Sequence, residues 1–136
     1  MSAALAVQKA IRARLSSTVG VTSLVPVANI LDRNALPAPD PSIIIGEDQA
    51  VEHGDIARRG ELIFSTLHIW KRELGLTGAK AIASAIRTAI HAERLHDAGG
   101  YHIADCRVSS MRFLRDPDGE TAHGIVTIET LVMEVA

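Results

Sequence analysis

Six histidines are the residues that first suggest chemistry in this chain, because imidazole binds metal ions and transfers protons. None of them has the spacing of a preformed metal site. His91 and His96 are five positions apart, which places them about 140° apart around a helix axis rather than on one face. His53 lies beside Glu52 and Asp55, where a solvated charged loop is a better interpretation than a cation site. The sequence therefore predicts no metal ligands.

Nucleophilic and phosphate-binding motifs are also missing from the sequence. No Gly-x-Ser-x-Gly turn occurs, and Ser109 and Ser110 fall in the middle of a predicted strand. Cys106 alternates with apolar neighbours on a face predicted to be buried, where a thiol is usually packing. The segment 75–80 lacks the Gly-Lys-Ser/Thr of a phosphate loop. We expect no catalytic residue, no cofactor and no enzymatic activity.

Length and composition indicate one globular domain over residues 1–136. Hydrophobic residues make up 47% of the chain and charged residues 22%, which excludes a disordered protein. The net charge of -2 argues against a nucleic-acid-binding module. No apolar stretch approaches the ~20 residues that cross a bilayer, and the N-terminal residues lack the pattern of a signal peptide. We therefore expect a protein made in the cytoplasm, without a membrane partner.

Hydrophobic periodicity predicts two helices. The first covers residues 2–17, where Ala4, Val7, Ile11 and Leu15 recur every three or four positions and Arg14 turns away from that stripe. The second covers residues 78–95, with Thr77 as its N-cap. A proline-rich connection over residues 34–41 lies between them and excludes helix there.

Strand patterns occupy much of the remaining chain. They are expected near residues 29–32 and at 42–46, 61–72, 101–114 and 124–135, and the last two are joined by a turn at 115–120. The sum is an α+β fold, a mainly antiparallel sheet with two helices packed on one face. Strands 61–72 and 124–135 carry apolar residues on both faces, which predicts contact with other subunits.

A charged segment is expected to project from this fold. The strand that begins at Ser42 is predicted to leave the core at Glu47, followed by a long exposed loop or hairpin arm to residue 59. The sign of the charge changes along it, which can mark a docking surface for a neighbour. We predict that the protein-interaction residues are Glu47, Asp48, Glu52, Asp55, Arg58 and Arg59.

A ligand-binding protein is the alternative from another functional class. It would need a pocket with converging polar groups. The residues that could form one are His68, Trp70, Tyr101 and His102, provided that the fold brings all four together.

The order of segments resembles the tail completion, or tail terminator, proteins that join heads to tails in long-tailed bacteriophages and gene transfer agents. The matching pieces are the opening helix around 5–11, the 21–30 stretch, the strand at 41–46, the strand that starts at Gly60, the alanine-rich helix 79–92 and the closing hairpin that ends at Val135. The resemblance covers essentially the whole chain and includes no catalytic residue.

The resemblance implies a structural virion protein that forms a ring, typically a hexamer, on the tail tube. Its implied partners are further copies of itself, the major tail tube protein and the head-tail connector or stopper protein, with DNA passing through the channel without specific binding. It implies assembly in the bacterial cytoplasm and then a place at the head-proximal end of the tail of a phage or phage-like particle. An adaptor or stopper at the same joint is the alternative within this class.

Overall fold

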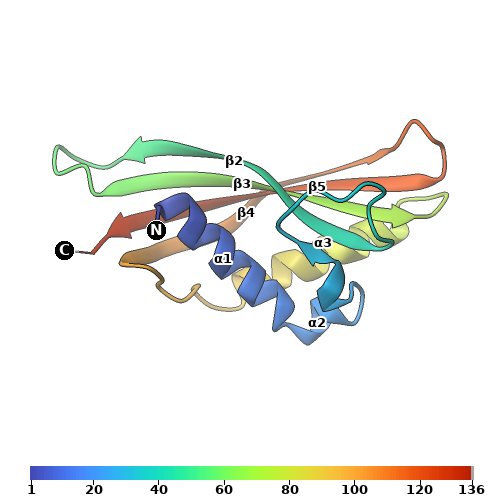
Figure 1. Cartoon of the computed structure of the whole chain (residues 1–136), viewed down its shortest axis with the longest axis horizontal. Helices are drawn as coiled ribbons and strands as arrows, with labels where there is room; N and C mark the ends of the chain where they lie inside the picture. The colour runs from blue at the N-terminus through green and yellow to red at the C-terminus, as the bar shows by residue number, and fades with distance from the viewer. Residues whose placement is uncertain (136) are drawn as a thin grey trace.

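One sheet organises residues 1–135, the part of the chain that the computed structural model describes (Figure 1). Its strand order is β1-β2-β3-β5-β4. β1 pairs in parallel with β2, and every other neighbouring pair is antiparallel. The strands are β1 (Ile30–Leu31), β2 (Ser42–His53), β3 (Gly60–Arg72), β4 (Tyr101–Arg115) and β5 (Thr121–Glu134). The predicted α+β fold with a mainly antiparallel sheet is confirmed.

The helices lie together on one face of this sheet (Figure 1). They are α1 (Ala3–Ser16), the one-turn α2 (Val19–Thr22) and α3 (Thr77–His91), and a short 3-10 turn (Val27–Asn29) precedes β1. The side chain of Ser2 caps α1 by accepting the N–H of Leu5 at 3.1 Å. No helix within residues 1–135 is both long enough and apolar enough to span a membrane.

The core fills the space between the helices and the sheet. Alanines on α3 let its backbone approach the strands closely, and isoleucines fill the remaining volume. The buried helix residues are Ala3, Ala6, Val7, Ile11 and Leu15 of α1 and Ala79, Ile82, Ala83, Ile86, Ala89 and Ile90 of α3. They meet the buried sheet residues Ile43, Ile45, Ile63, Leu67, Ile69, Val126, Ile128 and Val132.

The prediction that the strand starting at Ser42 ends near Gly46 is wrong. β2 continues to His53, past an irregularity in its pairing with β3 between Ile45 and Asp48. Its first four residues are buried and its last eight are exposed, so the distal half is held by hydrogen bonds to β3 rather than by burial. Of the two alternatives expected for this segment, a long loop or a hairpin arm, the structure has the hairpin arm: residues 47–59 with the start of β3, in which only residues 54–59 connect the strands.

The predicted ends of the second helix are also wrong. Thr77 lies inside α3 and is not its N-cap. The carboxylate of Glu73 instead accepts the N–H groups of Gly78, at 3.0 Å, and Ala79, at 3.3 Å, and so supplies the acceptor and the negative charge that a helix start favours. α3 ends at His91, four residues before the predicted end.

Arg14 satisfies backbone carbonyl groups at that end of α3. Its side chain is only 10% exposed, and it donates hydrogen bonds to the carbonyl oxygens of Ala89, Glu93 and Arg94 at 2.8, 2.9 and 3.0 Å. These oxygens have no partner within a regular helix once the helix stops. A residue expected to turn away from the core therefore fastens α1 to the end of α3.

We predict that Arg14→Met lowers the free energy of unfolding by about 2–3 kcal/mol, because it leaves part-buried carbonyl groups without a charged donor. Urea unfolding measures this difference. Arg87→Met is the matched control on the exposed face of α3 and is expected to change stability by less than about 0.5 kcal/mol. Equal effects of the two substitutions would contradict the role of Arg14.

Candidate functional site

The face of the sheet opposite the helices carries the groups that could contact a partner. Side chains alternate strictly along β3 and β5, so every second residue of each strand points away from the core. All of these residues are half-buried rather than fully exposed. This open face consists of Leu62, Phe64, Thr66, His68 and Trp70 of β3 and His123, Ile125, Thr127, Glu129, Leu131 and Met133 of β5.

A chain of polar side chains crosses one end of the open face. His68 Nε2 lies 2.8 Å from Glu47 Oε1, and His68 Nδ1 lies 2.9 Å from His123 Nε2. Because a carboxylate only accepts hydrogen bonds, His68 donates from Nε2. When His68 is neutral, its Nδ1 then accepts from His123 Nε2. The three side chains are therefore held in one orientation, although they come from three different strands.

An aromatic stack completes this cluster. The rings of Trp70 and His123 are parallel to within 10°, and their centroids are 3.8 Å apart. Gly46 makes room for the cluster, since a β-carbon at that position would lie 2.8 Å from the ring of His68. We call Glu47, His68, Trp70 and His123 the histidine cluster.

The electrostatics of the histidine cluster favour a charged carboxylate and a neutral His123. The hydrogen bond from His68 lowers the pKa of Glu47. Burial lowers the pKa of His123, and the neighbouring His68 lowers it further, while Asp116 and Glu47 act in the opposite direction. The open face thus contains a titratable group whose protonation is disfavoured by folding.

A cavity of about 1080 Å³ adjoins the histidine cluster. Residues 32–40, which include most of the proline-rich connection, line one side of it, and the strands β2, β3 and β5 line another. The turn between β4 and β5 contributes Asp116 and Asp118. We call this space the proline-segment cavity. Neither this cavity nor His123 was predicted from the sequence, because both depend on the pairing of distant strands.

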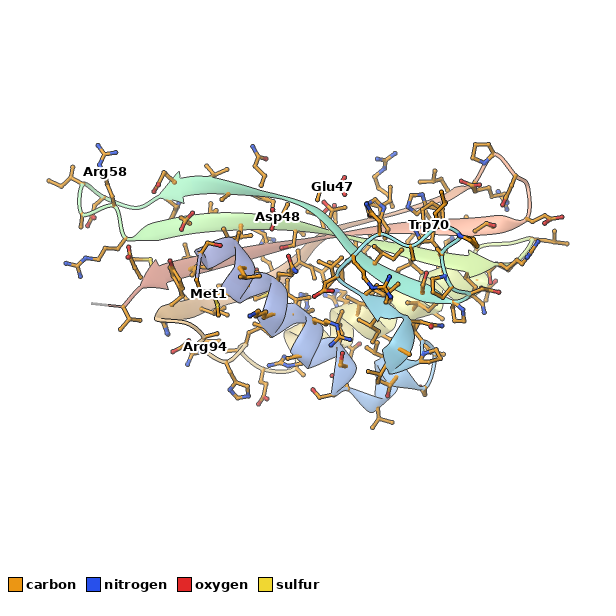
Figure 2. All side chains as sticks on the ribbon, viewed as in Figure 1. Met1, Glu47, Asp48, Arg58, Trp70 and Arg94 are labelled. Atoms are coloured by element: carbon orange, nitrogen blue, oxygen red, sulfur yellow. The ribbon has the colours of Figure 1, made fainter. Side chains whose placement is uncertain are left out.

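The structure separates the predicted interaction residues into two groups (Figure 2). Glu47 lies at the base of the arm, in the histidine cluster. The other five lie along the exposed arm: Asp48, Glu52, Asp55, Arg58 and Arg59. Arg58 marks the far end of the arm in Figure 2.

The alternative pocket of His68, Trp70, Tyr101 and His102 is wrong. Trp70 pairs with His123, whereas Tyr101 pairs with Glu134, at the other end of β5. At about 3.4 Å per residue, these positions are roughly 35 Å apart along the sheet. Within residues 1–135, no group of three or more His, Cys, Asp or Glu side chains is arranged to hold a metal ion.

We predict that acid destabilises the wild-type protein partly through His123. Its pKa in the folded state lies below the ordinary value of 6.5, so the unfolded chain binds the proton more readily. The contribution of neutral His123 to the free energy of unfolding is therefore fully present above pH 6.5, and it is lost as the pH falls through the folded pKa. Urea unfolding between about pH 8 and pH 5 measures the decline, and His123→Gln is expected to flatten it.

His96→Gln is the control for this titration, because His96 is an exposed histidine outside the sheet. It should leave the pH dependence of stability as in the wild type. A His123→Gln curve as steep as the wild-type curve would contradict the assignment. His123→Gln also removes the stack with Trp70, which lowers the free energy of unfolding at every pH. This loss does not change how steeply the free energy of unfolding falls with pH, which is the quantity compared.

The architecture defines a class of protein. It is a small α+β protein whose sheet is covered by helices on one face and extended by a projecting hairpin. The sequence matches the model of the family "Tail completion protein gp17" over residues 9–133. The chain therefore belongs to the tail completion protein family. Its role is structural, in the tail of a phage-like particle, and the prediction that it is not an enzyme is confirmed.

Two solved structures share this fold. A chain from the virion of a native gene transfer agent particle is 17% identical and superposes with a TM-score of 0.85, covering 98% of this chain and 99% of its own. The gp17 protein of bacteriophage SPP1 is 22% identical, with a TM-score of 0.63, and the match covers 94% of this chain and 89% of that one. No curated protein sequence matches significantly. The resemblance drawn from the sequence is confirmed.

Proposed function

We propose that this tail completion protein forms a ring on the end of the tail tube, stops tube polymerisation and presents a surface to the head-tail connector or stopper protein. Membership of the tail completion protein family supports a structural role in completing the tail. The observation that carries the ring is the open face of the sheet, which has apolar side chains and no helices over it. The proposed partners are other copies of the chain, the tube protein and the connector.

The open face has the character of a surface that a neighbour covers. An antiparallel sheet with one solvated face normally carries polar residues there. This face instead carries Leu62, Phe64, Ile125 and Leu131 in its centre, with Val51 of β2 at its side. Apolar patches of this kind mark protein interaction sites. A second subunit or the tube end would remove them from water.

The arm supports the same proposal. Its residues 47–59 are exposed, and it extends beyond the helices at one end of the molecule (Figure 1). Because residues 47–59 contribute nothing to the hydrophobic core of the subunit, they are free to bind another chain. Asp48, Glu52 and Asp55, with Arg58 and Arg59, are the proposed contacts of the arm. Glu47 contributes at its base.

Charge is consistent with a DNA channel through the ring. The chain has 14 basic and 16 acidic residues. A strongly basic lumen would bind the phosphate backbone and retain the DNA. We propose that the DNA passes through the ring without specific binding. We also propose that the ring is a hexamer, as the resemblance to tail terminator proteins implies. Assembly in the bacterial cytoplasm and a head-proximal position belong to the same proposal.

Native mass spectrometry, with and without purified tail tubes, tests the ring. Six copies of 14.5 kDa give a species of about 87 kDa, expected in solution or only on tube ends. Electron microscopy of the tubes distinguishes the alternatives. A terminator is expected to cap the ends of tubes of uniform length, whereas an adaptor or stopper is not expected to bind bare tubes. A monomer that never associates with tubes would contradict the proposal.

We predict that shortening the arm blocks assembly and leaves the subunit folded. Replacing residues 52–61 by Asn-Gly keeps β2 and β3 joined by a tight hairpin turn. The circular dichroism spectrum should match that of the wild type, because the replaced segment contains almost none of the core. The 87 kDa species should be lost. Arg87→Ala on the exposed face of α3 is the control that still assembles.

A further inference from the structure

The tip of the arm presents an apolar side chain beside two positive charges. Ile56 is 94% exposed. Arg58 and Arg59 follow it, and within residues 1–135 neither forms an ion pair. The nearby Asp55 is used by the turn itself, because its Oδ1 accepts the N–H of Ala57 at 2.9 Å. We call residues 54–59 the hairpin tip.

The backbone of the hairpin tip is held in an unusual conformation. Arg58 has φ of 54°, in the left-handed region that glycine or asparagine adopts at lower cost. Two hydrogen bonds stabilise the turn, in which the N–H groups of Arg58 and Ala57 donate to the carbonyl oxygen and to Oδ1 of Asp55 at 3.1 and 2.9 Å. The side chains of Arg58 and Arg59 are left exposed at the end of the arm.

The proline-segment cavity offers the complementary chemistry. Five carboxylates line it, against three permanent cations. Asp32 is exposed and has no partner in the described residues, and Asp116 of the β4–β5 turn also lines the cavity. Leu36 on the proline-rich connection is 100% exposed at the same cavity, and Trp70 is another of its lining residues. The cavity therefore combines net negative charge with uncovered apolar surface.

The hairpin tip lies at one end of the molecule, and the cavity lies far from it, in the other half. Figure 2 shows Arg58 at one end and Trp70, at the cavity, towards the other. A subunit therefore cannot insert its own tip into its own cavity. Contact between one copy's tip and the next copy's cavity is a head-to-tail contact, and contacts of this kind generate closed rings when the rotation between subunits closes.

We propose that the hairpin tip of each subunit docks in the proline-segment cavity of a second copy, with Ile56 against Leu36 and Trp70 and with Arg58 and Arg59 facing Asp32 and Asp116. This inference rests on the proposed ring and names the contact that holds it together. The apolar side chain excludes water around the charges, so the ion pairs contribute more than they would on an open surface. Opposite charge also sets which surfaces meet.

Charge reversal on each side of the contact tests the proposal. The first variant carries Arg58→Glu and Arg59→Glu. The second carries Asp32→Lys and Asp116→Lys. It spares Asp118, whose side chain accepts the N–H groups of Glu120 and Thr121 at 2.8 and 3.0 Å in the β4–β5 turn, whereas Asp116 Oδ2 accepts only the N–H of Asp118 there, at 3.4 Å. Each variant alone should associate at least about tenfold more weakly than the wild type, measured by native mass spectrometry and sedimentation with and without tail tubes.

An equimolar mixture of the two variants provides the decisive measurement. In an alternating ring, every reversed tip meets a reversed cavity and every native tip meets a native cavity. Rings should therefore form in the mixture, to within about threefold of wild-type affinity, and should contain equal numbers of the two chains. A single chain with all four substitutions should also assemble. Lys80→Glu with Arg87→Glu, both on the exposed face of α3, is the matched charge-reversal control and should assemble normally.

The outcomes separate this inference from the proposed function. If the tip-reversed variant assembles as well as the wild type, or if the mixture stays as weak as its components, the docking proposal is overturned while the ring stands. If the wild-type protein never forms rings, both proposals are overturned. Oxidation of Ile56→Cys with Leu36→Cys gives a direct readout: covalent ladders between subunits are expected, and their absence from assembled rings would overturn the docking.

Discussion

The long ladder between β3 and β5 governs how the other elements are placed. All thirteen residues of β3 pair with β5, so the alternation of side chains on one strand is matched by the other. One set of alternate residues packs under α1 and α3. The other set is forced onto a face that no helix covers, and this produces the open face. The same ladder supports the arm at one end and the histidine cluster towards the other.

Charged side chains connect the helices to this framework at their ends. Glu73 accepts N–H groups at the start of α3, and Arg14 donates to carbonyl groups where it stops. Both contacts satisfy backbone groups that a helix end leaves without partners. α3 is therefore held at both ends by residues outside it, which keeps the helices on one face and leaves the opposite face free for the proposed assembly.

Much of the fold could be predicted because its signals are local. The stripe of Val7, Ile11 and Leu15 predicted α1, and alternation in residues 61–72 predicted β3. The distal half of β2 was missed because residues 47–53 are mostly polar and become a strand only through hydrogen bonds to β3. The residue type of Thr77 predicts a cap, whereas the acceptor is Glu73. The histidine cluster could not be predicted, since Glu47, His68 and His123 meet only through strand order and register.

The two long helices, most of the strand segments, the absence of recognisable catalytic motifs and the resemblance to tail completion proteins follow from the sequence, because periodicity and segment order are properties of the linear chain. Three features appear only in the folded chain: the face of the sheet that stays open, the pairing of the charged segment as a hairpin, and a cavity lined by carboxylates far from Arg58. Strand register and helix placement bring together residues far apart in the chain, through contacts that no local pattern encodes.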